Sequence, residues 1–256
     1  MAFDTVRTSK LLIDGDLILY RCSSATEHAI QWDDENWILH SNLQESKDLV
    51  AGAIADLRSH VEADTIIVCL SDTANFRKEV YPEYKSQRKE TRKPIVYPEL
   101  RKWVEETYDV VTKPRLEADD VLGIMATHPD AGDVIIASED KDLQTIPCKL
   151  WRQGELKEVT EAAADYFWMM QTLTGDPTDG YKGCPGIGEK KAEAIIKPMM
   201  NLQTMWFNVC NAYQKAGLTV DDAIMNARLA RILRHGDYED GKVKLWEPQG
   251  AFANAA

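Results

Sequence analysis

Short apolar runs bounded by polar residues recur along the first 140 residues of the chain. Runs that are continuously apolar are typical of strands whose two faces are both buried. Amphipathic stretches at 43–60, 100–108 and from 116 to about 128 predict helices between these strands. Strands that alternate with helices indicate the α/β fold class, with a mostly parallel central sheet and helices on both faces. The predicted strands are 10–16, 65–70, 109–112 and 133–137.

The remaining pattern divides the chain into three parts. An α/β core is expected at 1–160, with a short basic arch region at about 76–102. A helical region at 161–240 is expected to continue from the core, and residues 241–256 are expected to form a tail that is disordered from 248 onward. Further predicted elements are a helix at 17–22, hairpins pairing 30–32 with 37–40 and 149–153 with 156–159, and helices at 161–174, 189–196, 201–216 and 220–234.

Acidic residues follow the predicted strands at their carboxyl ends. Asp14 and Asp72 end the first two strands, and Asp140 and Asp142 follow the last. Ligand sites in parallel sheets lie at this edge, so these carboxylates are expected to converge. Acids on the helix after 116 and in a later glycine-rich turn are expected to join them: Glu117, Asp119, Asp120, Asp176 and Asp179.

The acids at 117–120 have a second interpretation, because acidic residues also favour the first turn of a helix. Their recurrence at the ends of successive strands favours a shared site over separate helix caps. One or two of the nine acids are still expected to act as caps or turn residues. Ligands that are all oxygen favour Mg²⁺ or Mn²⁺, and this number of carboxylates suits two ions that together cleave a phosphodiester.

The basic residues are concentrated in two places in a chain whose formal net charge is −12. Overall acidity argues against a nucleic-acid partner, but residues 76–102 combine Lys and Arg with four aromatic side chains. Such a mixture suits base stacking and phosphate contact. It therefore favours a DNA-binding segment over a solvated helix face. At 183–192, a glycine turn with Gly186 and Gly188 precedes Lys190 and Lys191, which predicts a phosphate-binding turn.

Composition excludes several other classes of protein. The five cysteines are scattered and form no C-x-x-C pair, which predicts reduced thiols in a cytoplasmic protein instead of a disulfide framework or a zinc site. No apolar run approaches the roughly 18 residues of a membrane span. Neither a signal peptide nor a membrane partner is expected.

Residues 10–197 resemble the 5′ nuclease family, which includes flap endonucleases and the 5′-nuclease domain of bacterial DNA polymerase I. Within that family the chain resembles most the 5′→3′ exonucleases of short-tailed (podovirus) phages, through 75–79 (NFRKE), 145–147 (TIP) and 230–234 (ARILR). The motifs shared with the whole family are 12–16 (LIDGD), 70–72 (LSD) with 76–77 (FR), 82–85 (PEYK) with Arg88, 116–120 (LEADD), 138–143 (SEDKDL), 175–180 (GDPTDG) and 186–192 (GIGEKKA).

The resemblance implies a PIN-like fold with a helix-hairpin-helix-type motif, and it assigns roles to residues of the chain. Asp14, Asp72, Glu117 and Asp119 would hold one metal ion. Asp119, Asp140, Asp142 and Asp179 would hold the second, with Asp120 and Asp176 nearby. Lys85 and Arg88 would act with Asp119 in catalysis, and Tyr84 would stack on the terminal base. Residues implied to contact DNA are Arg77, Tyr84, Lys85, Arg88, Lys89, Gly186, Gly188, Lys190 and Lys191, and a K⁺ ion would bind at the glycine turn.

The function expected from these observations is a metal-dependent 5′→3′ exonuclease for duplex DNA in phage replication or recombination. Flap cleavage and removal of RNA primers are expected as related activities of a monomer that works beside replication proteins. Three alternatives stay open: a flap endonuclease with little exonuclease activity, a PIN-like ribonuclease, and an inactive protein that binds DNA junctions.

Overall fold

A six-stranded sheet forms the centre of the molecule. The computed structural model describes residues 9–90 and 92–249, without the side chains of Lys89 and Glu90. The strand order is β5-β4-β1-β6-β7-β8, in which the first five strands are parallel and the edge strand β8 is antiparallel to β7. The mostly parallel sheet is therefore confirmed. The strands are β1 (Ser9–Asp14), β4 (Thr65–Cys69), β5 (Val110–Val111), β6 (Asp133–Ala137), β7 (Cys148–Arg152) and β8 (Glu155–Val159).

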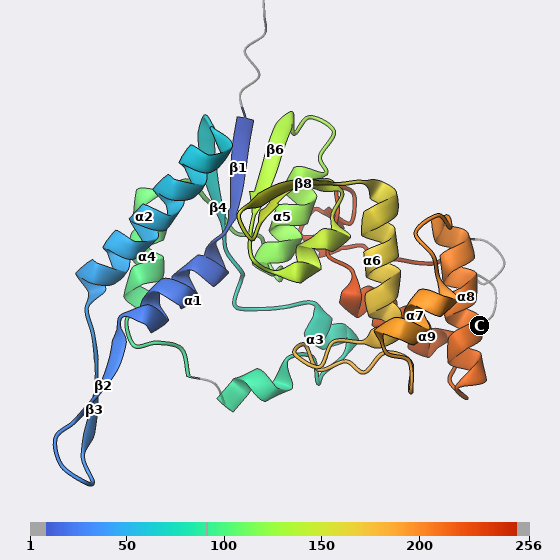
Figure 1. Ribbon diagram of the computed structural model, residues 1–256, viewed down its shortest axis with the longest axis horizontal. Coiled ribbons are helices and arrows are strands. Elements are labelled where there is room, and N and C mark those ends of the chain that lie inside the picture. Colours follow the sequence, from blue (N-terminus) through green and yellow to red (C-terminus); the bar gives the residue numbers. More distant parts are fainter. Residues whose placement is uncertain (1–8, 91, 250–256) are drawn as a thin grey trace, which may run out of the picture.

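Helices cover both faces of this sheet, as the alternating pattern predicted. Leu11 and Ile13 of β1 point into one apolar cluster, which α1 (Gly15–Ala25), α2 (Leu43–Val61) and α4 (Tyr97–Thr107) complete. Leu12 points to the opposite face and packs with Val121 and Leu122 of α5 (Ala118–Ala126). Side chains alternate across a strand, so β1 supplies both cores. Figure 1 shows α1, α2 and α4 on one side of β1 and α5 on the other.

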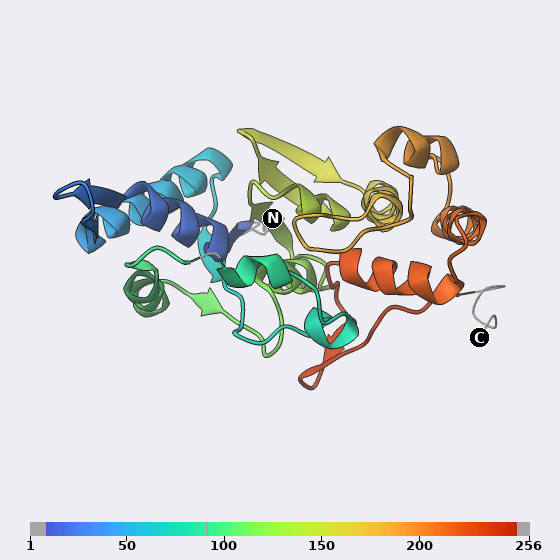
Figure 2. The same ribbon diagram turned by 90° about the horizontal axis from the view of Figure 1, so that it is seen from below.

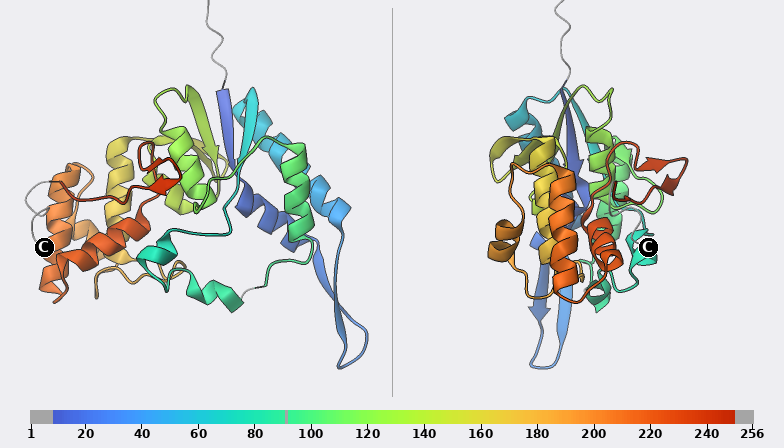
Figure 3. Two further views of the ribbon diagram at one scale, coloured as in Figure 1. Left: turned by 180° about the vertical axis from the view of Figure 1, so that it is seen from behind. Right: turned by 90° about the vertical axis from the view of Figure 1, so that its right-hand side faces the viewer.

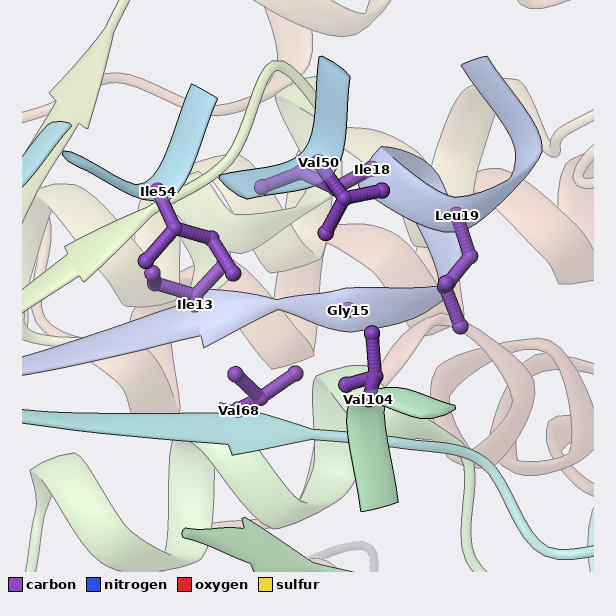
Figure 4. Close-up of a pocket in the computed structure, with 8 residues that line it drawn as sticks. All are labelled: Ile13, Gly15, Ile18, Leu19, Val50, Ile54, Val68 and Val104. Atoms are coloured by element: carbon purple, nitrogen blue, oxygen red, sulfur yellow. The ribbon is translucent and has the colours of Figure 1, made fainter. Parts of the chain in front are cut away.

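Strand β1 ends at Asp14, two residues before its predicted end, and helix α1 begins directly after it. The turn depends on Gly15, which lies among apolar side chains of β1, α1, α2, β4 and α4 (Figure 4). A Cβ atom on this residue would lie 2.5 Å from Cγ1 of Val68 and 2.8 Å from the carbonyl oxygen of Cys69. The backbone oxygen cannot move aside without disturbing the central strand. Asp14 is the N-cap of α1. No residue larger than glycine fits beside it at position 15.

Gly15→Ala is expected to lower the free energy of unfolding by about 1–3 kcal/mol, the usual cost of overpacking a core. Urea unfolding followed by circular dichroism measures this change. Gly52→Ala in α2 is the matched control, because no atom lies within 4 Å of the Cβ position there. That variant is expected to gain up to about 1 kcal/mol from helix propensity. Equal effects of the two substitutions would contradict the close packing around Gly15.

The C-terminal helices form a separate apolar cluster beside the sheet, at the right of Figure 1. They are α6 (Glu161–Thr174), α7 (Glu189–Ile195), α8 (Leu202–Lys215) and α9 (Val220–Ala230), close to the predicted ranges. Helix α9 was predicted to continue to 234, and this is wrong. Arg231 has φ −77° and ψ 117°, and the carbonyl groups of Leu229 and Arg231 accept hydrogen bonds from the Arg77 guanidinium.

Residues 241–249 are not a detached tail, which corrects the prediction for that part of the chain. Two short strands, β9 (Tyr238–Glu239) and β10 (Lys242–Val243), pair as an antiparallel hairpin. Trp246 then packs edge-on against Trp168 and Trp206, with ring centroids 4.9 Å apart in both pairs. Burial of a large aromatic ring ties this segment to the C-terminal helices. Residues 250–256, where the tail was also expected, lie outside the described part of the chain.

The predicted basic arch is a short connection without two long helices. Its described residues, 76–90 and 92–96, form α3 (Arg77–Val80) and the 3₁₀ helix η1 (Ser86–Glu90) before the chain reaches α4. Figures 1 and 3 show it running below the carboxyl ends of the strands, from the C-terminal helices toward α4. Figure 2 shows the same connection crossing the middle of the molecule. The segment therefore passes the edge of the sheet where the acids were expected.

The predicted hairpin at 30–40 is present and stands away from the central sheet (Figures 1 and 3). Its strands are β2 (Glu27–Gln31) and β3 (Trp37–Ser41). At its base, the Glu27 carboxylate accepts hydrogen bonds from the Arg92 guanidinium and from the backbone N–H of Ile95. The hairpin thus anchors the end of the basic segment. No helix of the described residues is long and apolar enough to cross a membrane.

Candidate nuclease site

The adjacent strands β1 and β6 bring Asp14 and Asp140 to the same edge of the sheet. The chain passes from β1 to β4 on one side and returns to β6 on the other, so ligands are expected at this switch point. Asp14 is buried and accepts a hydrogen bond from the Ser138 hydroxyl at 2.7 Å. Burial raises the pKa of Asp14 to about 6, although Ser138 and the N–H of Leu17 act against this increase. The environment therefore disfavours an isolated negative charge at Asp14.

Asp119 joins Asp14 and Asp140 from the first turn of α5. Burial, and then the charges of Asp14 and Asp140, raise the pKa of Asp119 well above its usual value. These mutual effects show that the three carboxyl groups lie within electrostatic reach of one another. Nearby negative charges of this kind are stable together only with protons or cations between them. The predicted convergence of acids from two strand ends and the helix after 116 agrees with this arrangement.

A second group of acids also interacts with Asp140. Burial first, and then the charge of Asp140, raise the pKa of Asp142 to about 7, with smaller contributions from Asp176 and Asp179. The Gln171 amide of α6 donates to Asp142 at 2.6 Å. Asp140 thus interacts with both groups of carboxylates.

Basic residues of the connecting segment reach into the same cluster. Lys85 Nζ lies 2.6 Å from Glu117 Oε1 and 3.5 Å from Asp179 Oδ1, and Arg88 donates to Asp179 at 2.9 Å. Burial alone would raise the pKa of Glu117, but the charges of Lys85 and Arg77 lower it to about 2. Lys85 has a φ of +54°. This left-handed conformation is costly for a non-glycine residue and is often kept at functional sites.

Arg77 is not placed to contact DNA, which corrects the expectation for this residue. Its side chain is 3% exposed, and its guanidinium donates to both carboxylate oxygens of Asp120 at 2.7 Å. It also donates to Glu117 at 3.2 Å. A guanidinium fork that is buried against a carboxylate has no donor left for a phosphate.

Asp120 and Tyr84 are likewise assigned different roles by the structure. Both Asp120 oxygens accept hydrogen bonds from Arg77 and one also accepts from the N–H of Leu233, so this carboxylate is no metal ligand as placed. Tyr84 is 2% exposed, which leaves no ring face for a terminal base. Its hydroxyl donates toward Glu117 at 3.0 Å and Asp179 at 2.7 Å. The ring therefore orients two acids of the cluster.

Asp72 lies beside the cluster in a loop that its own carboxylate stabilises. The N–H groups of Arg115 and Thr73 donate to its two oxygens at 2.7 Å each, and these hydrogen bonds lower the pKa of Asp72. Its assignment to a metal ion stays a prediction. Asp176 similarly accepts from the N–H of Thr178 and lies 3.3 Å from Lys141 Nζ.

The glycine turn is exposed at the start of α7. Nothing lies within 4 Å of a Cβ position at Gly186 or Gly188, and Lys190 and Lys191 are exposed on the first turn of the helix. Lys191 Nζ donates to the carbonyl group of Gly186 at 2.7 Å. This open surface is compatible with the approach of a phosphate backbone. The side chain of Lys89, another predicted DNA contact, lies outside the described residues.

Sequence reasoning missed three side chains that hold the acids in place: Ser138, Lys141 and Gln171. Ser138 and Lys141 flank the predicted acids of the 138–143 motif, so their position was a usable signal. Gln171 belongs to α6, and only the packing of that helix against η2 (Lys141–Thr145) reveals its contact with Asp142. A periodic pattern along α6 contains no such information.

The carboxylate cluster fits divalent cations by its chemistry. All of its donors are oxygens, which Mg²⁺ and Mn²⁺ prefer, and burial with like charges disfavours the metal-free ionised state. Gln171 also has a buried Oε1 atom without a hydrogen-bond partner, directly beside the Asp142 contact. Within residues 9–90 and 92–249, no three acidic, histidine or cysteine side chains yet surround one point closely enough to hold an ion.

Comparisons with known proteins identify the family of the chain. The family model for the "5'-3' exonuclease, N-terminal resolvase-like domain" matches residues 9–166. The exodeoxyribonuclease of Enterobacteria phage T3 is 31% identical over 93% of this chain and 93% of the relative. The exonuclease of Escherichia phage T7 is 30% identical over the same shares.

Solved structures share the fold at lower identity. The flap endonuclease of bacteriophage T5, solved with DNA and metal ions, superposes with a TM-score of 0.63 and 18% identity. That superposition covers 87% of this chain and 88% of the other chain. A structural match at 18% identity shows only the fold. The assignment to a family therefore rests on the family model and the two phage exonucleases. The chain belongs to the 5′–3′ exonuclease family and is a nuclease that hydrolyses phosphodiester bonds.

Proposed function

We propose that the chain is a metal-dependent exonuclease that degrades duplex DNA from its 5′ ends. The observation that carries this proposal is the meeting of two kinds of groups at one edge of the sheet. Asp14, Asp119 and Asp140 form an acidic cluster, and Lys85 and Arg88 reach the adjoining carboxylates from a separate basic segment. Metal-dependent hydrolysis of a phosphodiester requires carboxylates that bind the metal ions and basic side chains that bind the phosphate. This site combines both.

The residues of the chain would divide the chemical work. Asp14, Asp119, Asp140, Asp142 and Asp179, with Glu117, are the candidates to hold two ions of Mg²⁺ or Mn²⁺. When bound, the two ions supply an activated water and stabilise the leaving oxygen. Lys85 would leave Glu117 for the scissile phosphate, and Arg88 would leave Asp179 in the same way.

The duplex would be held away from this centre. Gly186, Gly188, Lys190 and Lys191 are proposed to contact its phosphates through backbone N–H groups and ammonium charges, with a K⁺ ion at the turn. Such contacts carry no sequence information, which suits an enzyme that acts at any 5′ end. RNA primers and 5′ flaps are further proposed substrates, and action as a monomer beside replication proteins belongs to the same proposal.

A single set of reactions tests the proposed function and includes removal of the metal. Blunt, recessed and flapped duplexes are labelled at either the 5′ or the 3′ end and incubated with wild-type protein in Mg²⁺ or in excess EDTA. Early release of short products from the 5′ label, gradual shortening of 3′-labelled strands, and no cleavage in EDTA are expected.

Other outcomes favour the alternatives. Cleavage of flaps alone would indicate a flap endonuclease, and faster degradation of single-stranded RNA in a parallel reaction would indicate a ribonuclease. Duplex binding without any product would indicate an inactive junction-binding protein. Undiminished cleavage in EDTA would overturn metal dependence.

A further inference from the structure

The chain that follows α9 lies against Arg77 and Asp120, which hold the start of α5. We name residues 229–234 the α9 extension: the last two residues of α9 and the four that follow. The carbonyl groups of Leu229 and Arg231 accept from the Arg77 guanidinium at 3.1 and 2.6 Å. The N–H of Leu233 donates to Asp120 Oδ1 at 3.1 Å. Arg77 in turn donates to the Glu117 carboxylate, and Asp120 accepts from the backbone N–H of Glu117. Asp120 lies in the first turn of α5, the helix that also carries Asp119.

The same extension reaches the second group of acids through Arg234. Its guanidinium donates to the carbonyl group of Thr145 at 2.9 Å and to the Asp165 carboxylate at 2.8 Å. Thr145 ends η2, and its hydroxyl donates to the carbonyl group of Asp142 at 2.8 Å. The extension therefore contacts residues that support both groups of acids.

Close packing makes these contacts rigid. Ile232 and Leu233 are buried in the apolar cluster that also contains Val121 and Leu122 of α5. A Cβ atom at Gly123 would lie 2.3 Å from the carbonyl oxygen of Leu233, so α5 and the extension touch backbone to backbone. An element packed this tightly transmits a displacement instead of absorbing it.

We propose that the α9 extension sets the distance between the two carboxylate groups of the nuclease site, and that Arg234 is the positioning residue on the Asp142 side. The proposal rests on the proposed metal-dependent function. Residues that orient metal ligands by hydrogen bonds commonly change metal affinity by about 10–100-fold when they are removed. The ARILR motif at 230–234 would therefore position the carboxylate groups, although its side chains lie outside the acidic cluster.

Arg231 provides an unusually close control for Arg234. Both guanidinium groups make an ion pair at 2.8 Å, Arg231 with Asp237 and Arg234 with Asp165. Their side chains are 13% and 12% exposed. Only the Arg234 guanidinium reaches η2, because Arg231 contacts the network through its backbone carbonyl group, which a substitution retains. Loss of either ion pair is thus expected to destabilise the protein to a similar extent.

The experiment compares Mn²⁺ binding to full-length wild type, Arg231→Gln, Arg234→Gln and Arg234→Lys without DNA. Free Mn²⁺ is followed by electron paramagnetic resonance, and thermal unfolding is recorded with and without Mn²⁺. Arg234→Gln is expected to weaken Mn²⁺ binding about tenfold and to reduce the stabilisation by Mn²⁺. Arg231→Gln is expected to keep the affinity within about twofold of wild type, and Arg234→Lys to recover part of the loss.

The outcomes separate this inference from the proposed function. Equal Mn²⁺ affinities for Arg231→Gln and Arg234→Gln, in folded proteins, would overturn the positioning role while leaving metal-dependent cleavage intact. Wild type that neither binds Mn²⁺ nor gains thermal stability from it would overturn the metal-dependent function itself. Weaker Mn²⁺ binding confined to Arg234→Gln, with rescue by lysine, would support the role of the extension.

Discussion

Asp119→Asn is expected to slow hydrolysis of duplex DNA on the order of 10³-fold, equivalent to roughly 4 kcal/mol of transition-state stabilisation. The amide keeps the size of the side chain but removes the carboxylate that interacts with those of Asp14 and Asp140. Release of 5′-labelled nucleotides in Mg²⁺ measures the rate. In EDTA the variant is expected to be at least as stable as wild type, because burial and like charges penalise ionised Asp119 in the folded protein.

The sign of this stability effect follows from the pKa of Asp119, which is higher in the folded protein than in the unfolded chain. Folding is then opposed by ionisation as the pH rises above the unfolded pKa, and asparagine removes that opposition. Asp133→Asn is the control, since Asp133 begins β6 at the opposite edge and pairs with Lys149. Its activity is expected to stay within about twofold of wild type. Cleavage by Asp119→Asn at the wild-type rate would remove Asp119 from the site.

Much of the fold could be predicted because local patterns determine it. The apolar runs of β4 and β6 and the amphipathic period of α2 and α6 fixed those elements to within about two residues. The errors arose where distant groups decide the backbone. Helix α9 ends four residues early because Arg77 binds the carbonyl groups of Leu229 and Arg231.

The same distinction applies to the site. Acids at strand ends could be located from sequence because parallel topology brings strand ends together. The roles of Arg77, Tyr84 and Asp120 could not be predicted from sequence. Contacts over long sequence separations determine where each of these side chains points. Arg77 and Asp120 are 43 residues apart, and Tyr84 and Asp179 are 95 apart. A basic or aromatic residue within a basic segment gave no indication that it would turn inward.

Arg77→Met is expected to lower the free energy of unfolding by about 3–5 kcal/mol, as is usual when one partner of a buried ion pair is removed. Methionine fills much of the volume but leaves the fully buried Asp120 without its guanidinium partner. Two carbonyl groups at the end of α9 also lose their donor. Guanidinium chloride unfolding, followed by tryptophan fluorescence, measures the loss.

A second substitution distinguishes the buried ion pair from a contact with DNA. Arg77→Met with Asp120→Leu removes both charges, and replacement of a buried pair by apolar residues is commonly far less costly than breaking it. The double variant is therefore expected to be more stable than Arg77→Met alone. A direct DNA contact would give the reverse pattern: Arg77→Met would unfold like wild type, and the affinity for duplex DNA would fall equally in both variants. Because all five guanidinium N–H donors of Arg77 lie within reach of protein oxygens, the stability pattern is the expected one.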